Sequence, residues 1–89
     1  MVLIVTYTLR NQYKDYSPFF NSIKSNCTEW WHFLDSTFIV STPKSAAEFA
    51  QALFPYMEAT DSVFVSRLQK DYNGWLPEAA WNWLNTKYF

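Results

Sequence analysis

Two periodicities of hydrophobic and polar positions divide the chain into seven segments. Four segments are short and rich in β-branched and aromatic residues, which is typical of strands. Three others carry apolar residues at helical spacing behind a Ser or Pro start signal, which is typical of helices. The strands are predicted at residues 2–9, 29–34, 37–41 and 61–68, and the helices at 17–26, at 45–57 and from residue 77 onward.

Local signals give the boundaries of several segments. Ser17 is predicted as an N-cap with Pro18 at the first helical position. Ser45 and Glu48 form a capping-box pair, in which each side chain satisfies a backbone N–H group of the other residue. The pair at 35–36 is predicted as a two-residue turn that joins the second and third strands into a hairpin.

The order βαββαβ followed by a helix predicts an α+β, ferredoxin-like domain that spans residues 1–89. Its four-stranded antiparallel sheet would carry two helices on one face, plus a short C-terminal helix with Ala80, Trp81, Leu84 and Tyr88 on one side. The other face would be open and would carry large apolar residues. We therefore expect a second copy of the chain to cover that face.

The strand segment EWWHFL places Trp30 and His32 on one face and Trp31 and Phe33 on the other, because side chains alternate along a strand. A buried imidazole needs a hydrogen-bond partner, so the face with His32 is the one expected near solvent or a ligand. Trp31 and Phe33 are therefore predicted under the two helices, with Trp30 and His32 toward the dimer seam.

Composition narrows the class of protein. The chain has 89 residues, 49% of them hydrophobic and 21% aromatic, which fits one domain that relies on bulky side chains for its core. The net charge of −1 and the absence of a basic run make nucleic acid a less favoured partner. One cysteine, Cys27, and no apolar run of about 18 residues lead us to expect a cytoplasmic protein without a membrane segment.

The segments together resemble a known group of small proteins. They are LIVTYTLR, WWHFLDSTFIVST, SAAEFAQALFPYM, DSVFVSRL and WLPEAAWNWL, and they span nearly the whole chain. The chain resembles the SinR family of bacteria and phages, a ferredoxin-like group distinct from the helix-turn-helix repressor of similar name. It is distantly similar to the dimeric nuclease subunit of CRISPR adaptation complexes. In that wider family an Asp ends the first strand and binds Mg²⁺ at the dimer seam; the matching position here is Thr8.

No catalytic constellation is visible. His32 is the only histidine, and no motif in the sequence supplies a nucleophile or metal to act with it. The alternative to catalysis is that His32 packs within the fold. Asp35 could orient a ligand or bond its own backbone in the turn. Asp15 and Asp35 lie in loops that need not meet, so no metal site is predicted. The residues expected to bind a ligand or partner are Thr8, Arg10, Trp30, His32, Asp35, Arg67 and Trp75, with no cofactor.

These observations lead to a hypothesis about function. We expect a cytoplasmic homodimer that binds a protein partner or a nucleotide-like molecule without catalysis. The resemblance implies a role in phage–host defence or counter-defence. The alternatives are a Mg²⁺-dependent nuclease of the CRISPR-adaptation type and a nucleic-acid-binding subunit that does no chemistry. Aromatic residues near Arg10 and Arg67 would support the last of these, because aromatic rings stack on bases.

Overall fold

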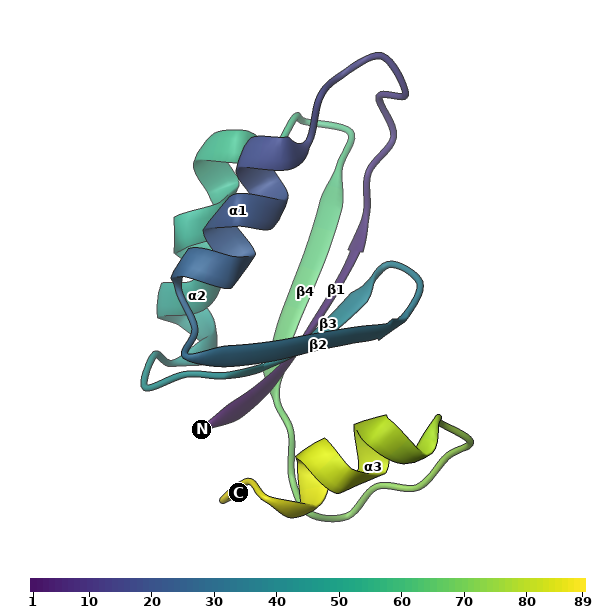
Figure 1. Cartoon of the computed structure of the whole chain (residues 1–89). Helices are drawn as coiled ribbons and strands as arrows, with labels where there is room; N and C mark the ends of the chain where they lie inside the picture. The colour runs from purple at the N-terminus through teal and green to yellow at the C-terminus, as the bar shows by residue number, and fades with distance from the viewer.

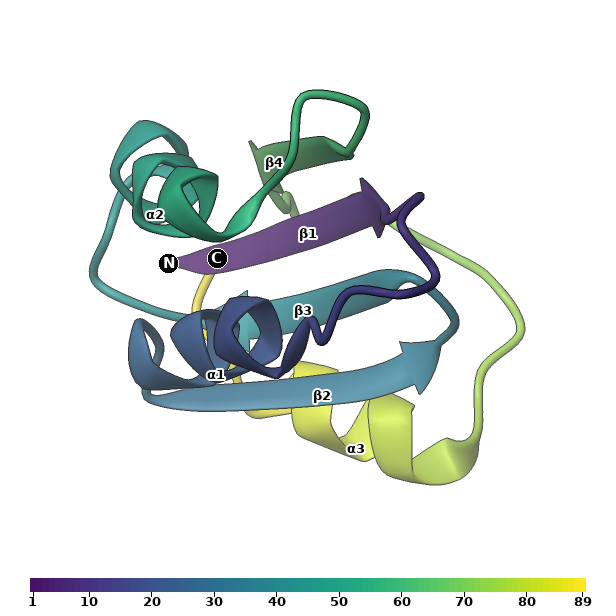
Figure 2. The same ribbon diagram turned by 90° about the horizontal axis from the view of Figure 1, so that it is seen from above.

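A computed structural model describes residues 1–89 as one four-stranded sheet with helices on both faces (Figures 1 and 2). The strands are β1 (Val2–Thr8), β2 (Glu29–Leu34), β3 (Thr37–Ser41) and β4 (Ser62–Arg67). The helices are α1 (Ser17–Ser25), α2 (Ala46–Leu53) with the short 3-10 helix η1 (Phe54–Tyr56) after it, and α3 (Glu78–Asn85). The strand order is β2-β3-β1-β4 and every pair is antiparallel, which confirms the predicted ferredoxin-like α+β fold.

Two local predictions are confirmed in detail. Ser45 caps α2 in a capping box: the Glu48 amide donates to the Ser45 hydroxyl at 3.2 Å, and the Ser45 amide donates to a Glu48 carboxylate oxygen at 3.1 Å. The β2–β3 hairpin closes at Asp35 and Ser36, and Ser36 adopts a φ of 55°. The backbone enters the left-handed region at the second turn residue only, since Asp35 keeps a negative φ.

The start of α1 differs from the prediction by one residue. The helix includes Ser17, Tyr16 occupies the N-cap position and Pro18 follows in the first turn. The reason is the Asp15 carboxylate, which accepts hydrogen bonds from the Ser17 amide at 2.9 Å and from the Ser17 hydroxyl at 2.6 Å. Ser17 is therefore the residue whose amide is capped, and it does not cap the helix itself.

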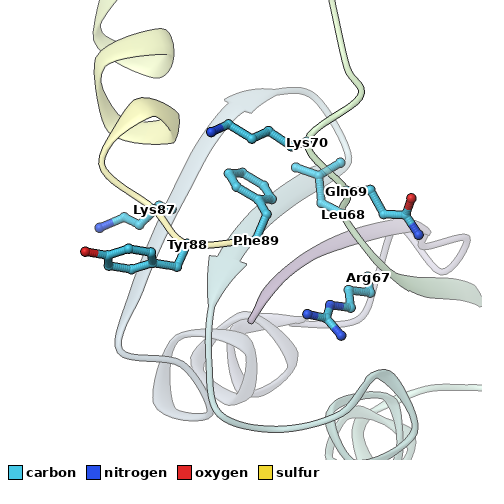
Figure 3. Close-up of a pocket in the computed structure, with 7 residues that line it drawn as sticks. All are labelled: Arg67, Leu68, Gln69, Lys70, Lys87, Tyr88 and Phe89. Atoms are coloured by element: carbon cyan, nitrogen blue, oxygen red, sulfur yellow. The ribbon is translucent and has the colours of Figure 1, made fainter.

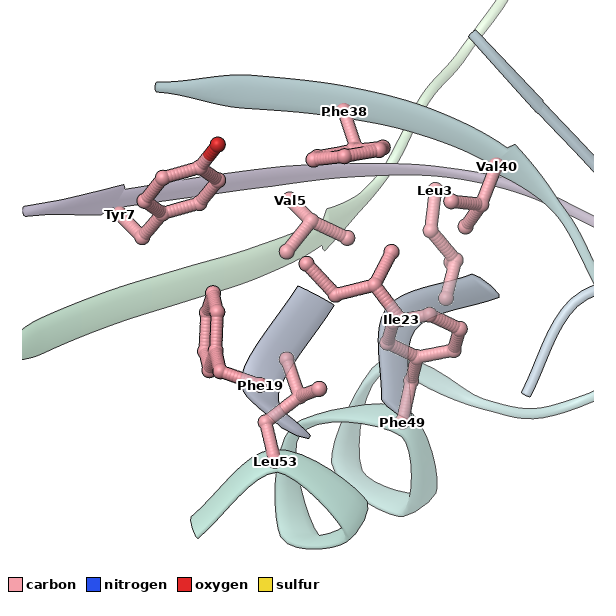
Figure 4. Close-up of a cluster of buried hydrophobic side chains, with 9 residues drawn as sticks. All are labelled: Leu3, Val5, Tyr7, Phe19, Ile23, Phe38, Val40, Phe49 and Leu53. Atoms are coloured by element: carbon pink, nitrogen blue, oxygen red, sulfur yellow. The ribbon is translucent and has the colours of Figure 1, made fainter. Parts of the chain in front are cut away.

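The main core lies between the sheet and the pair α1 and α2, as predicted (Figure 4). The central strands β1 and β3 contribute alternate side chains to this core, and α1 and α2 contribute one apolar stripe each. The Tyr7 and Phe19 rings meet edge to face, with their centroids 5.3 Å apart. The nine buried residues of this cluster are Leu3, Val5, Tyr7, Phe19, Ile23, Phe38, Val40, Phe49 and Leu53.

The opposite face of the sheet is not left open, in contrast to the expectation. The segment after β4 folds back, and α3 packs over β2 and β3 on the side away from α1 and α2 (Figures 1 and 2). Val2, Trp31, Ile39, Ala80 and Leu84 form a second buried cluster there. The chain thus covers much of this face by itself, although Phe64 on β4 remains 67% exposed.

The assignment of the two faces of β2 was wrong. Trp31 is 4% exposed, but it lies under α3 and not under α1 and α2. Trp30 and His32 lie on the α1 side, where both rings contact Phe38, while Phe33 is 46% exposed. The prediction assumed that the imidazole of His32 would not lie on the side of the sheet that the two helices cover. Because β2 is an edge strand, the His32 ring can pack against Phe38 on that side and still remain exposed.

The chain after α3 also departs from the prediction. The helix ends at Asn85, so Tyr88 lies beyond it and is 94% exposed, away from the apolar side that holds Ala80 and Leu84. Lys87 forms an ion pair with Glu29, which ties this segment to the start of β2. None of the helices combines the length and the apolar character that a bilayer crossing requires.

Candidate functional site

A groove of about 300 Å³ runs between α1 and the edge strand β2 on the main-core side of the sheet. Its floor is aromatic, and polar side chains surround it. We call it the α1–β2 groove, and its lining residues are Ser17, Phe20, Asn21, Lys24, His32 and Phe38.

Helical spacing explains why α1 contributes four residues to the groove. Ser17, Phe20, Asn21 and Lys24 stand at positions i, i+3, i+4 and i+7, so they share one face of the helix. Phe19 and Ile23 lie on the neighbouring face and are buried in the core. The helix thus presents a mostly polar stripe to β2 beside its buried stripe.

His32 is positioned by two contacts. Its ring stacks on Phe38, with the centroids 4.1 Å apart and the planes 18° apart. Its Nε2 atom lies 3.3 Å from the Tyr7 hydroxyl. Burial and the negative charge of Asp35 raise the pKa of Tyr7 above its usual value. The hydroxyl therefore stays protonated at neutral pH and can donate to Nε2 of an imidazole that carries its proton on Nδ1.

Lys24 supplies the positive charge of the groove. Its amine lies 4.8 Å from the centre of the Trp30 ring, a cation–π contact that holds the long side chain beside β2. The Trp30 ring in turn packs on Phe38 at 5.6 Å and is 42% exposed. One cation is therefore held next to an exposed aromatic surface.

Tyr7 beside the groove and Cys27 after α1 both have pKa values raised by burial. A catalytic nucleophile or base needs a pKa near the working pH, yet the pKa of Tyr7 is shifted upward, away from neutrality. His32 has the Tyr7 hydroxyl as its side-chain partner, and no carboxylate orients the ring. Burial also raises the pKa of Cys27 to about 11, so this thiol is protonated at neutral pH.

The structure brings some of the predicted site residues together and separates others. Trp30 and His32 lie side by side on β2, and Asp35 is close enough to influence Tyr7. Thr8 is exposed at the end of β1, opposite Ser62 of β4.

Arg10 belongs to a loop network outside the groove. Its backbone amide donates to Asp61 at 2.9 Å, and the Tyr16 hydroxyl donates to the same carboxylate at 2.9 Å. The amide of Glu58 donates to the other oxygen at 3.0 Å. The network joins the segment after β1 to the segment before β4, which makes it a structural feature of the loops.

Arg67 lies in a different pocket, at the C-terminal end of β4 (Figure 3). The pocket measures about 480 Å³ and also includes Lys70, Lys87 and the Tyr88 side chain. Figure 3 shows Arg67 and Lys70 on different sides of the Phe89 ring, so their charges do not converge on one point. Trp75 is 99% exposed and belongs to neither pocket.

Sequence reasoning missed Ser17, Asn21 and Lys24 as groove residues. The available signal was their spacing with Phe20, which puts one mostly polar stripe on the first helix. The signal was insufficient, because it does not say which strand that stripe faces. The structure provides this information by placing α1 next to β2.

Possible metal ligands do not cluster. The hairpin turn and the segment after β1 lie at the same end of the sheet, since the Tyr7 amide donates to the Ser36 carbonyl at 3.0 Å. Asp15 is engaged by Ser17, which lowers the pKa of its carboxyl group. No group of three or more His, Cys, Asp or Glu side chains is placed to hold a metal ion.

The fold and the groove define a ferredoxin-like α+β domain with an aromatic, singly cationic surface groove. No model of a known protein family matches the chain, and no curated protein matches it in a sequence comparison. The resemblance to the SinR family therefore stays a prediction.

Proposed function

We propose that the protein is a non-catalytic homodimer that binds a small aromatic anion, of the size of a nucleoside monophosphate, in the α1–β2 groove. The observation that carries this proposal is the contact of the Lys24 amine with the half-exposed Trp30 ring, near the exposed His32 ring that stacks on buried Phe38. A planar base would stack on the exposed rings, and a phosphate would accept from Lys24.

The size of the groove limits the ligand. Small-molecule sites usually measure about 300–1,000 Å³, and this groove of about 300 Å³ is at the lower end. A mononucleotide is small enough for a site of this volume, whereas a dinucleotide would extend beyond the groove. The polar side chains of Ser17 and Asn21 are placed to bond a sugar or base edge.

Titration calorimetry with adenosine monophosphate tests the proposal. We expect binding to the wild-type protein, and at least about tenfold weaker binding to Lys24→Gln, because a hydrogen bond to a charged group contributes about 1.5–3 kcal/mol. Adenosine without the phosphate should bind both proteins equally. Lys70→Gln is the matched control, since it removes a lysine from the C-terminal pocket instead.

Two results would overturn the proposal. One is the absence of binding by any of the four common nucleoside monophosphates at millimolar concentration. The other is a loss of affinity in Lys70→Gln with none in Lys24→Gln, which would transfer the site to the C-terminal pocket.

The dimer is proposed to form through β4. This strand pairs only with β1, so its outer edge is free, and Phe64 on it is 67% exposed. Two copies that pair along β4 would satisfy that edge and bury both Phe64 rings. Light scattering should give a dimer for the wild type and a monomer for Phe64→Ser, with Phe33→Ser as the exposed control. A wild-type monomer at high micromolar concentration would contradict this.

The proposal includes a cellular compartment and a biological role for the protein. Cys27 is a lone protonated thiol, which fits a reducing compartment such as the cytoplasm. On its resemblance to the SinR family, we propose that the protein acts in phage–host defence or counter-defence. A change in phage plating efficiency when the gene is expressed in a bacterial host would support this, and no change with any phage tested would count against it.

A further inference from the structure

The pocket at the C-terminal end of β4 gathers positive charge on a protein whose net charge is −1. Three of the seven Lys and Arg residues, namely Arg67, Lys70 and Lys87, line this cavity of about 480 Å³, and no acidic side chain lines it (Figure 3). A concave site lined by one sign of charge attracts ligands of the opposite sign. The lining therefore favours an anion.

Two of the three cations are available to bind an anion. Lys87 forms the one ion pair of the protein, with Glu29, and its amine also lies 4.7 Å from the centre of the Trp83 ring. Arg67 and Lys70 are exposed and have no ion-pair partner. An incoming anion can therefore contact either of them without displacing an acidic side chain.

The surface between these two cations is apolar and held in place. The half-buried Phe89 ring packs against the second buried cluster and contacts the Tyr72 ring, with the centroids 5.5 Å apart. The Leu68 amide donates to the Val2 carbonyl of β1 at 2.8 Å. This bond also fixes the backbone next to Arg67, so the cation at the end of β4 projects from an ordered strand.

The positions of the two cations determine the shape of the anion. Arg67 and Lys70 lie on different sides of the Phe89 ring (Figure 3). A compact anion, such as a single phosphate, can be centred on only one of them. A molecule with an anionic group at each end can contact both, and its apolar middle then lies on the Phe89 ring. A cavity of this volume is large enough for such a molecule.

We propose that the C-terminal pocket binds a small linear dianion, a molecule with two separated anionic groups such as a dicarboxylate. Arg67 binds one group through the parallel N–H groups of its guanidinium, Lys70 binds the other, and Phe89 contacts the apolar chain between them. The site goes beyond the proposed nucleotide groove and does not depend on it, because a nucleoside monophosphate carries its negative charge on one phosphate.

A matched pair of probes tests the inference. Suberate and octanoate have carbon chains of the same length, but suberate carries a carboxylate at each end and octanoate at one end only. Titrated into the full-length wild-type protein at low salt, suberate should bind about fivefold more tightly, the gain expected from one additional exposed ion pair. In ¹H–¹⁵N NMR spectra it should shift the amides of residues 67–70 and 87–89.

Variants of the two cations make the test specific. Arg67→Gln and Lys70→Gln should each bind suberate about fivefold more weakly than the wild type, because each leaves one carboxylate without a cation. Both positions are exposed, so neither variant removes a core contact. Lys24→Gln is the control, since it removes the cation of the α1–β2 groove and should bind suberate like the wild type.

Three results would overturn the proposal. One is the failure of adipate, suberate and sebacate, which differ in length, to bind at millimolar concentration. Another is equal affinity of the wild type for suberate and octanoate. The third is unchanged suberate affinity in either Arg67→Gln or Lys70→Gln.

Discussion

Trp30 and Trp31 are adjacent in β2, yet they belong to different layers of the protein. The Trp30 ring lies 4.8 Å from the Lys24 amine of α1, beside the main core. The Trp31 ring is buried under α3 with Val2 and Ile39. The edge strand therefore connects two hydrophobic clusters, one on each face of the sheet.

This arrangement predicts unequal losses on truncation. Trp31→Ala should lower the free energy of unfolding by about 3–5 kcal/mol, the usual loss for a buried aromatic residue. Trp30→Ala should lower it by about 1 kcal/mol, because that side chain is 42% exposed. Urea unfolding followed by circular dichroism measures both. Equal losses, or the larger loss in Trp30→Ala, would contradict the two-layer description.

Asp61 should make the protein sensitive to acid. The backbone amides of Arg10 and Glu58 donate to its carboxylate and lower its pKa. Its contribution to stability is therefore complete above the unfolded pKa of about 3.9 and is lost as the pH falls through the lower folded pKa. Asp61→Asn should be less stable than the wild type at pH 7, and the difference should shrink toward pH 2.

Thermal melts between pH 2 and pH 7 measure this difference. Asp71→Asn is the control, since Asp71 is exposed in the loop before α3. If the gap between Asp61→Asn and wild type were the same at both ends of this range, the hydrogen bonds to the ionised carboxylate would not be what stabilises the loops.

Cys27 should react slowly in the folded protein. Burial raises the pKa of its thiol from 9.0 to about 11, and each pKa unit is a tenfold change in thiolate. At pH 8 iodoacetamide should therefore alkylate the native chain about a hundredfold more slowly than the urea-unfolded chain. Mass spectrometry over time gives both rates, and similar rates would show that the thiol is accessible and unperturbed.

Thr8 leads us to expect no Mg²⁺-dependent nuclease activity. The prediction rests on the distant similarity to CRISPR-adaptation nuclease subunits that the sequence analysis expects: those subunits carry a metal-binding Asp at this position, and a threonine hydroxyl offers no charge to hold the ion. Cleavage of labelled DNA and RNA with added Mg²⁺ should match the protein-free control. Robust cleavage that is lost in Asp35→Asn would instead make Asp35 a metal ligand.

The elements governed by local sequence were predictable. The bounds of β2 and β3 and the capping box at Ser45 and Glu48 agree with the sequence, because strand alternation and capping depend on neighbouring residues. The start of α1 shifted by one residue, since the competing contact is with Asp15, a residue before the predicted cap.

The partners of each face were not predictable in the same way. Alternation shows that Trp30 and Trp31 point in opposite directions, but with helices on both faces it cannot say which residue lies under which helix. The apolar stripe of α3 indicates that the helix packs against another part of the protein, but it does not identify which face of the sheet that is. For the same reason the sequence predicted His32 of the groove but not Lys24. These two residues are brought together only by the tertiary packing of α1 beside β2.

The most direct test of nucleotide binding in the α1–β2 groove is a ¹H–¹⁵N NMR titration of the wild-type protein with adenosine monophosphate. We expect saturable shifts confined to the amides of residues 17–24 and 30–38, which surround the groove. Shifts confined to residues 67–70 and 87–89, around the C-terminal pocket, or no shifts at millimolar nucleotide, would contradict it.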